Sequence, residues 1–325
     1  MKVKNMLTMG CLALLTGCQQ TDGLENQSEE LPMYVEASIE EEPMSRYVSS
    51  DNSPNNLSFA VGDEIGLFVH DRSVVKWTKE TEGWNPATFS YWPNKSDEYC
   101  FYAYYPYDEA TSMKSVPMPS LAGQKGTIES LSACDFLVAS SKESYDTDGV
   151  VSFTGNASFK HVSSLVAVTI KGDCDLKTSL INEISFSATD IATATTYSFD
   201  GNQVSKTGQS LNELVFSSLG ANGSGIQMAN KDEVLYFILN SGISLSNITF
   251  CIKYSTAGVN YKAEKTNLGS GELASGGRYN FNLSIFDGEL SLSGGTIQNW
   301  GEGTPMEDIE INNPTVEEES GDEDA

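Results

Sequence analysis

Short β-prone runs separated by turn residues recur along most of the chain, and they constrain the fold more than any other feature. The clearest run is Tyr99–Tyr107, which is rich in aromatic residues and is interrupted by Pro106. Between such runs, pairs such as Gly62-Asp63 supply turn chemistry. Long helix-forming runs are scarce. The pattern predicts an all-β protein built from many short strands.

The expected strands form two groups, one before and one after residue 159. The expected strands lie at 59–69, 99–107, 135–139, 150–153, 159–170, 181–188, 195–199, 212–217, 233–240, 246–254, 258–264, 278–286 and 289–300, with a hairpin over 74–93. At about 150 residues per domain, the length accommodates two domains. The sequence therefore predicts an N-terminal β domain over residues 47–158 and a C-terminal β domain over residues 159–305.

The first eighteen residues have the organisation of an export signal. Lys2 and Lys4 precede an apolar stretch over Met6–Leu15, which is too short to span a bilayer as a helix. The stretch is followed by Thr16, Gly17 and Cys18, so small residues precede a cysteine. We expect residues 1–18 to be a lipoprotein signal peptide, and Cys18 to carry a diacylglycerol and acyl chains such as palmitate. An ordinary secretory signal with an incidental cysteine is the alternative.

Residues 33–39 alternate between apolar and polar side chains. As a strand, they would place Val35, Ala37 and Ile39 on one face and the intervening residues on the other. Residues 19–32 are polar and acidic, which is typical of a flexible tether. We therefore expect a tether and an isolated strand within residues 19–46, followed by an exposed polar stretch that is open to proteases.

The formal net charge of −26 excludes several partners. A chain this acidic would be repelled by nucleic acid and by anionic lipid. Part of the charge lies in residues 306–325, which carry nine acidic side chains and no basic one. We expect no nucleic-acid partner and a solvated C-terminal end.

Four cysteines follow residue 18: Cys100, Cys134, Cys174 and Cys251. None has CxxC spacing and the chain has two histidines, so no metal site is expected. Export permits one disulfide between the first two and one between the last two, and four free thiols are the alternative. No G-x-S-x-G elbow, P-loop or H-E-x-x-H motif occurs. The sequence predicts neither a cofactor nor an enzyme, although a hydrolase with paired carboxylates stays open.

Alternate aromatic residues of the run Tyr99–Tyr107 would lie on opposite faces of a strand. Packing in a core is their expected role, and a carbohydrate-stacking patch is the alternative. Trp77 and Trp84 have the same two interpretations, as hairpin packing or as part of such a patch.

A set of motifs spreads over most of residues 59–300 and follows a cysteine motif at the N-terminus. The motifs are Cys18, Phe59–Phe68, Tyr91-Trp92-Pro93, Phe101–Tyr107, Asp135–Ala139, Phe159-Lys160-His161, Gly277–Phe281 and Trp300. In this order the set resembles the fimbrillins, the subunits of type V pili in Bacteroidales-like bacteria. The resemblance implies two transthyretin-like β-sandwich domains in tandem and export as a lipidated precursor. It also implies a structural role for His161, with a buried imidazole bonded to backbone.

The resemblance further implies cleavage by an arginine-specific surface protease in the N-terminal region. Arg46 is the only arginine between residues 18 and 59 and stands where that cut would fall, so Tyr47 would become the new N-terminus. Residues 33–39 would then be a leading strand that departs with the lipid. An uncut subunit that stays as a membrane anchor is the alternative.

Loss of a leading strand would expose unpaired backbone groups and an apolar slot, which a strand from a neighbouring subunit could fill. That donor would come from the C-terminal region. Two segments qualify, Glu289–Trp300 and Met306–Val316, and the second has Ile309 and Ile311 on one face. The acidic residues beyond Val316 have no counterpart in the family pattern.

These features predict a structural pilus subunit that polymerises by donor-strand exchange and supports adhesion. Its partners would be other pilus subunits, an arginine-specific protease and the outer membrane, reached through the lipid on Cys18. Because the chain is close to two plain domains with a tail, a stalk or anchor is favoured over a tip. A monomeric outer-membrane lipoprotein that binds glycans is the main alternative, and a surface hydrolase with a β-sandwich body is the third.

Overall fold

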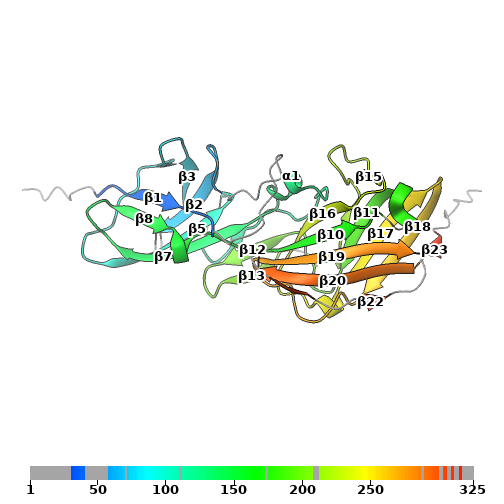
Figure 1. Cartoon of the computed structure of the whole chain (residues 1–325). Helices are drawn as coiled ribbons and strands as arrows, with labels where there is room; N and C mark the ends of the chain where they lie inside the picture. Colours follow the sequence, from blue (N-terminus) through cyan, green and yellow to red (C-terminus); the bar gives the residue numbers. More distant parts are fainter. Residues whose placement is uncertain are drawn as a thin grey trace, which may run out of the picture. The chain divides into compact units, whose positions relative to one another are not determined.

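The chain is nearly all β, with several sheets, as the strand pattern predicted (Figure 1). The computed structural model describes residues 31–40, 58–69, 72–109, 112–172, 175–207, 212–286, 289–299, 303–305, 309–310 and 315–316. Among these residues, no helix has the length and apolar composition needed to cross a membrane.

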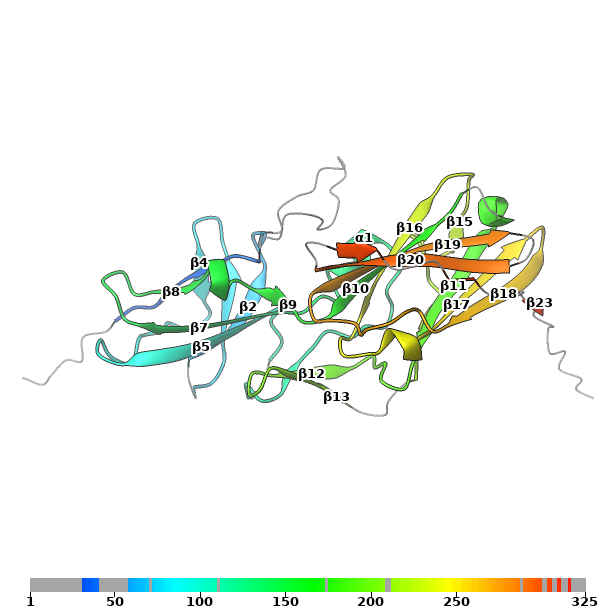
Figure 2. The same ribbon diagram turned by 60° about the horizontal axis from the view of Figure 1, so that its bottom comes forward.

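Strands from the first half of the chain build a six-stranded and a two-stranded sheet. The larger sheet has the order β4-β3-β2-β5-β7-β9, and the smaller one pairs β1 with β8 (Figures 1 and 2). The bounds are β1 Tyr34–Ala37, β2 Glu64–Val69, β3 Val75–Lys79, β4 Trp84–Pro86, β5 Glu98–Tyr105, β7 Leu137–Ser144, β8 Val150–Phe153 and β9 Lys160–His161. Side chains from both sheets pack into one hydrophobic cluster, the first core, which includes Val35, Ile65, Trp77, Phe101 and Val151.

Two further six-stranded sheets enclose the second core. One has the order β16-β10-β19-β20-β21, with β22 paired to β20. The other has the order β14-β11-β17-β18-β23, with β15 paired to β11. The bounds are β10 Ser164–Ile170, β11 Leu180–Ser187, β14 Glu213–Phe216, β15 Ile226–Gln227, β16 Glu233–Leu239, β17 Thr249–Thr256, β18 Val259–Thr266, β19 Gly277–Phe286, β20 Glu289–Asn299, β21 Gly303–Pro305, β22 Ile309–Glu310 and β23 Thr315–Val316. The second core includes Val166, Ile184, Phe237, Phe250 and Phe281.

The apolar run of β10 has a structural reason. β10 has a neighbour on each side, because β16 pairs with it antiparallel and β19 pairs with it parallel. Six of its seven residues are buried, and Thr169 is half-buried. The burial of successive residues shows that both faces of β10 are covered. Such a strand needs apolar side chains at successive positions rather than in strict alternation.

A small sheet joins residues from the two halves of the chain. β12 (Thr195–Ser198) forms a hairpin with β13 (Gln203–Lys206) and also pairs with β6 (Val116–Pro117). Around it lies a third core, which includes Phe136 and Tyr197. The sheet therefore connects a strand from the region before residue 159 to a hairpin from the region after it.

Residues 121–134 also contribute to the second core, although they precede residue 159. Leu121, Cys134 and Leu131 of the short helix α1 (Ile128–Leu131) are buried in that core. The second core is consequently completed by a segment that the sequence alone assigned to the N-terminal domain.

Gln124 closes the outer edge of β16 with its side chain. Its Nε2 donates to the carbonyls of Leu121 at 2.9 Å and Ile238 at 2.8 Å. Its Oε1 accepts the Ile238 N–H at 2.7 Å, and the side chain is buried. An exposed strand edge invites pairing with other chains. Here one amide side chain occupies both backbone groups of an edge residue.

Every segment that the sequence predicted as a strand contains one in the structure. β7 is longer than predicted and continues to Ser144, because its ladder with β5 extends as far as the Glu98–Ser144 pair. The strands β6, β13 and β15 and the helix α1 were not predicted. These elements have four residues or fewer, so they carry too little periodicity to be recognised.

Candidate functional site

The segment of residues 31–40, here the leading segment, completes the first core. β1 runs parallel to β8, with Tyr34 opposite Val150. The parallel contact continues to an isolated bridge between Ile39 and Phe159. Figure 1 shows β1 as a blue arrow beside β8.

The first end of the leading segment is hydrogen-bonded on both sides. The Tyr34 N–H donates to the Gly149 carbonyl at 3.0 Å, and the Met33 N–H donates to the Ser90 carbonyl at 2.9 Å. The Leu31 carbonyl, on the same side as Ser90, accepts the Trp92 N–H at 2.9 Å. This end is therefore held between two neighbouring stretches of chain.

The second end is bonded along one side in the described part of the chain. The Ser38 N–H donates to the Phe153 carbonyl at 3.0 Å, and the Glu40 N–H donates to the Phe159 carbonyl at 2.9 Å. The Phe159 N–H returns a bond to the Ser38 carbonyl at 2.9 Å. On the other side of β1 lies a groove of about 880 Å³ that is also lined by residues 79–85 of the β3–β4 turn.

The predicted leading-strand residues divide between buried and half-buried positions. Val35 and Ile39 are each 6% exposed and belong to the first core, whereas Ala37 is half-buried against it. Leu31 and Met33 are buried in the same core. Tyr34, on the opposite face, is 53% exposed. The alternation expected for residues 33–39 is therefore present in the side-chain burial.

An ion pair ties the end of the leading segment to β9. Lys160 Nζ lies 3.4 Å from Glu40 Oε1, and the two side chains are 53% and 40% exposed. An exposed pair of this kind stabilises by about 1 kcal/mol or less. It nevertheless fixes where the Lys160 amine lies.

Several predicted site residues lie outside the described residues: Cys18, Arg46, Tyr47 and Ile311. Ile309 lies in β22, opposite Leu292 of β20. Of the two predicted donor segments, 289–300 corresponds to β20, and 306–316 contains β22 and β23.

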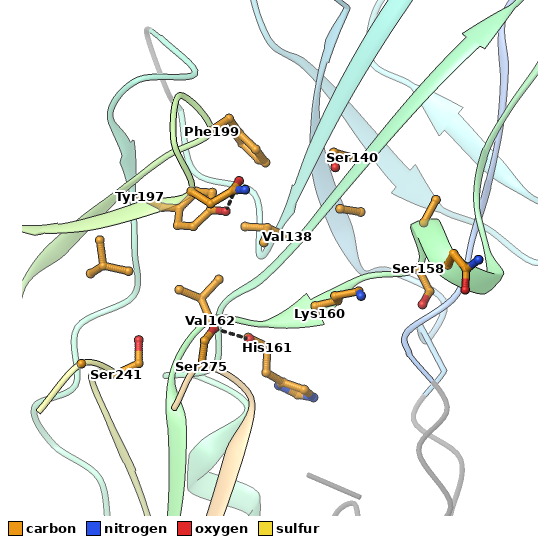
Figure 3. Close-up of a pocket in the computed structure, with 16 residues that line it drawn as sticks. Val138, Ser140, Ser158, Lys160, His161, Val162, Tyr197, Phe199, Ser241 and Ser275 are labelled. Carbon is orange, nitrogen blue, oxygen red and sulfur yellow. Dashed lines mark hydrogen bonds between the residues drawn. The ribbon is translucent and has the colours of Figure 1, made fainter. Parts of the chain in front are cut away.

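A cavity of about 590 Å³ lies beside the β12–β13 hairpin, and we call it the hairpin cavity. Its walls come from β7, β9, the hairpin and the turns near Ser158 and Ser241 (Figure 3). The Tyr197 hydroxyl donates to Asn202 Oδ1 at 3.0 Å at this cavity. Burial raises the pKa of Tyr197 above its ordinary value, so this phenol stays protonated at neutral pH.

His161 is buried, as predicted, but its imidazole partner is a carboxylate rather than backbone. Its Nδ1 lies 3.0 Å and 2.9 Å from the two carboxylate oxygens of Asp135. The backbone carbonyl of His161 accepts a hydrogen bond from the Ser275 hydroxyl at 3.0 Å (Figure 3). The imidazole therefore joins two segments that are 26 residues apart.

Cys100, Cys134 and Cys251 are free thiols, which agrees with the second of the two alternatives left open by the sequence. Cys174 lies outside the described residues, but Cys251, the partner that a disulfide would require, is free. Burial raises the pKa of Cys134, with a further contribution from Asp135, and burial also raises the pKa of Cys251. Both thiols are thus kept in their unreactive protonated form.

Trp77 and Trp84 do not form a surface patch for carbohydrate. Trp77 and Trp84 belong to the β3–β4 hairpin, with 0% and 6% of their surface exposed. They pack in the first core, which agrees with the hairpin interpretation. Within the described residues, no group of three or more His, Cys, Asp or Glu side chains could hold a metal ion.

The hairpin cavity was not found from the sequence. One available signal was the Asp200-Gly201 pair, which is typical of a tight hairpin and would have indicated β13. The cavity itself combines β7, β9 and β12 residues that are far apart in the chain, so local pattern could not reveal it.

Two solved structures have a similar all-β fold. A proposed cell adhesion protein of Bacteroides uniformis has a TM-score of 0.56 and 17% identity, over 83% of this chain and 99% of that chain. A second, from Bacteroides ovatus, has a TM-score of 0.54 and 13% identity, over 87% of this chain and 98% of that chain. At these identities the likeness concerns the fold. None of the curated proteins matches the sequence.

The fold thus defines a class of all-β proteins in which an N-terminal segment completes the first core. The chain belongs to the fimbrillin-like family, whose model matches residues 49–300. The resemblance inferred from the ordered motifs is therefore confirmed. Family membership supports a structural, non-enzymatic role in a fimbria at the cell surface.

Proposed function

We propose that the chain is a stalk or anchor subunit of a cell-surface fimbria, polymerised by donor-strand exchange and supporting adhesion. Family membership supports the fimbrial role. The observation that carries the exchange mechanism is β1, which pairs with β8 alone among the described strands and places Val35 in the first core. The proposed subunit has two transthyretin-like β-sandwich domains, over residues 47–158 and 159–305.

In this proposal, the precursor is tethered to the outer membrane by lipid on Cys18. An arginine-specific protease cuts after Arg46, and Tyr47 becomes the new N-terminus. The leading segment then departs with the lipid, so Cys18 is a delivery tag that is lost at maturation.

Loss of the leading segment would leave an unfavourable groove. Leu31, Met33, Val35 and Ile39 are buried in the first core, and burial stabilises by about 1.5–3 kcal/mol per side chain of this size. The open groove would expose the apolar neighbours of these side chains together with the free backbone edge of β8. A strand with alternating apolar residues would relieve both costs.

The segment 306–316 is the better donor of the two candidates. β20 is paired with β19 from Gly277–Asn299 to Phe286–Glu289, so its release would break a long ladder. By contrast, β22 and β23 each pair over two residues, with β20 and β18. Detaching the later segment, with Ile309 and Ile311, would break far fewer backbone hydrogen bonds.

The test is to treat the purified precursor with an arginine-specific protease. We expect a new N-terminus at Tyr47 and ladders that resist SDS. Arg46→Lys is the matched control, because it keeps the charge and removes the cleavage site. Of the other two arginines, Arg278 lies inside β19, and a cut at Arg72 would be recognised by its own N-terminal sequence.

A trimmed protein that stays monomeric would contradict polymerisation. If that monomer bound a polysaccharide, the interpretation as a glycan-binding outer-membrane lipoprotein would be favoured instead. If Tyr47 never became an N-terminus, the chain could still be an uncut anchor, but not a stalk subunit.

A further inference from the structure

The leading segment has a strand edge that no described strand covers. β8 lies on one side of β1, and in a parallel ladder only alternate residues of a strand bond to a given neighbour. Here these residues include Tyr34 and Ser38, whose N–H groups each donate toward the β8 side at 3.0 Å. The N–H and C=O groups of Val35 and Ala37 therefore point to the side opposite β8.

These backbone groups have no partner within the described residues. The Met33 N–H points the same way and donates to the Ser90 carbonyl, but no such bond follows at Val35 or Ala37. An edge with unpaired N–H and C=O groups is a ready template for a further strand. The edge of β1 can therefore accept an extended chain.

The uncovered edge opens onto the groove of about 880 Å³ described above, here the edge groove. Across the groove lie residues 79–85 of the β3–β4 turn, and its lining also includes Val150 and Thr154. β4 is itself the last strand of its sheet. The space beside β1 is thus bounded by the end of another sheet and is not filled by a paired strand of the described chain.

Carboxylates dominate the ionisable groups of the edge groove. Glu36, Glu80 and Glu82 line it, against a single basic residue, Lys79. The three glutamates are exposed, and within the described part of the chain none of them forms an ion pair. The Lys79 amine lies over the Trp84 ring, 6.0 Å from its centroid. An occupant that complements this groove carries positive charge.

The same charge disfavours a second copy of the chain as the occupant. The chain has 45 acidic and 19 basic residues. A second β1 would bring another Glu36 against the same three carboxylates, and like charges on neighbouring strands destabilise their pairing. The groove therefore fits a basic segment of a different protein.

We propose that the edge groove binds an extended peptide of a partner protein, with lysine or arginine at alternate positions, and that this peptide adds as a strand to the free edge of β1. Its backbone bonds to Val35 and Ala37, and its basic side chains lie beside Glu36, Glu80 and Glu82. Removal of the leading segment would remove the site, so the partner would bind only the uncut precursor. That consequence alone rests on the proposed function.

The experiment is isothermal titration of the purified precursor with a blocked pentapeptide of alternating lysine and valine. Salt at about 0.15 M screens charges farther away than about 8 Å. The matched peptide has glutamate in place of lysine. We expect the lysine peptide to bind and the glutamate peptide to show no binding.

A triple variant tests the carboxylates of the edge groove. Replacing Glu36, Glu80 and Glu82 by glutamine should weaken binding of the lysine peptide roughly tenfold, as suits three exposed ion pairs. The matched control replaces Glu109, Glu129 and Glu213 by glutamine. These are exposed carboxylates outside the groove, and their loss changes the net charge equally. The control variant should bind as the unaltered chain does.

A second variant tests the backbone pairing. Ala37→Pro removes the N–H that faces the groove and leaves the charges in place, and proline is tolerated at such an edge position. Binding of the lysine peptide should weaken roughly three- to tenfold, while circular dichroism shows that the chain stays folded. Methylation of the peptide nitrogens, at all lysines or at all valines, should abolish binding in at least one of the two forms.

Absence of binding by the lysine peptide would overturn the proposal and leave the fimbrial function untouched, whereas a missing cut at Arg46 would leave the groove in place. Equal weakening by the two triple variants would assign the peptide to the acidic surface in general. Unchanged binding by Ala37→Pro and by both methylated peptides would rule out strand addition. If the precursor dimerised without peptide and Ala37→Pro abolished the dimer, the occupant would be a second copy and the peptide assignment would be wrong.

Discussion

At the scale of single residues, Tyr105 links the end of β5 to the turn before β2. Its hydroxyl donates to Asp63 Oδ1 at 3.1 Å, and Asp63 Oδ2 accepts the Ala60 N–H at 2.7 Å. Burial, followed by the effect of the Asp63 carboxylate, raises the pKa of Tyr105 from 10.0 to about 12. The sequence identified Asp63 as a turn residue, but its tyrosine partner is 42 residues away and could not be inferred.

Stability should therefore fall as the pH rises from about 10 to about 12. In this window the unfolded chain releases the Tyr105 proton and the folded chain retains it, so the unfolded state binds fewer protons and gains stability relative to the folded state. Tyr105→Phe should lose less stability over this window than the unaltered chain. Urea unfolding of both proteins would measure this, with data at pH 8 as the reference. Equal losses would mean that the folded chain does not retain this proton.

For His161, as for Asp63, the local sequence did not reveal the hydrogen-bond partner. Its burial was predicted correctly through the Phe159-Lys160-His161 motif, whereas its partner Asp135 was not. Backbone was the predicted partner. Asp135 was missed because it comes close to His161 only through the pairing of β7 with β9, and this pairing cannot be read from the local sequence. The cysteines could not be assigned from the sequence either, because export permitted disulfides and free thiols alike, and the fold shows Cys100, Cys134 and Cys251 as free thiols.

At the scale of elements, alternation located most strands well but did not determine their partners. The pattern over residues 33–39 predicted a strand and its buried face, and both are present. Nothing in that pattern indicates that β1 pairs with β8 in parallel, because direction and neighbour depend on the rest of the chain. The partner of residues 289–300, one of the two predicted donor strands, could not be predicted either. The fold shows that this segment pairs with β19 of the same chain.

The Gln124 side chain at the edge of β16 should stabilise the element measurably. Gln124→Ala would leave the N–H and C=O of Ile238 without their present partners, and buried unpaired groups cost about 1–3 kcal/mol each. We expect a loss of roughly 2–4 kcal/mol in the free energy of unfolding. Hydrogen exchange at the Ile238 amide should also accelerate.

Gln203→Ala is the matched control for this substitution, because Gln203 is an exposed glutamine in β13. It should change the free energy of unfolding by less than about 0.5 kcal/mol. A loss for Gln124→Ala no larger than that of this control would mean that water replaces the side chain at the strand edge.

At the scale of the whole molecule, the segment of residues 116–134 couples the two halves of the chain. β6 joins the small sheet with β12, and Leu131 is buried in the second core. A boundary near residue 159 was predicted from the restart of the strand pattern. That pattern gives no sign of a segment that crosses to another core, because β6 and α1 are too short to show periodicity.

Leu131→Ala should therefore destabilise the second half of the fold, although the residue belongs to the first half of the sequence. Loss of a buried leucine costs about 2–5 kcal/mol, and we expect faster hydrogen exchange in β10 and β16. Ser132→Ala, at the exposed neighbouring position, is the control. Faster exchange confined to α1 itself would show that the two halves are not coupled through this segment.

The leading segment is held unevenly along its length. Around Leu31–Tyr34 it is bonded on both sides, and at Ser38–Glu40 the described bonds run to one side. A strand held in this way would peel from its Glu40 end, which is also the end nearer to Arg46. An incoming strand could then pair first with the backbone edge freed at this end. It could extend the pairing one residue pair at a time and so displace the leading segment stepwise. The groove would never need to stand fully empty, so the exchange could be quick even though the strand being replaced buries four large apolar side chains.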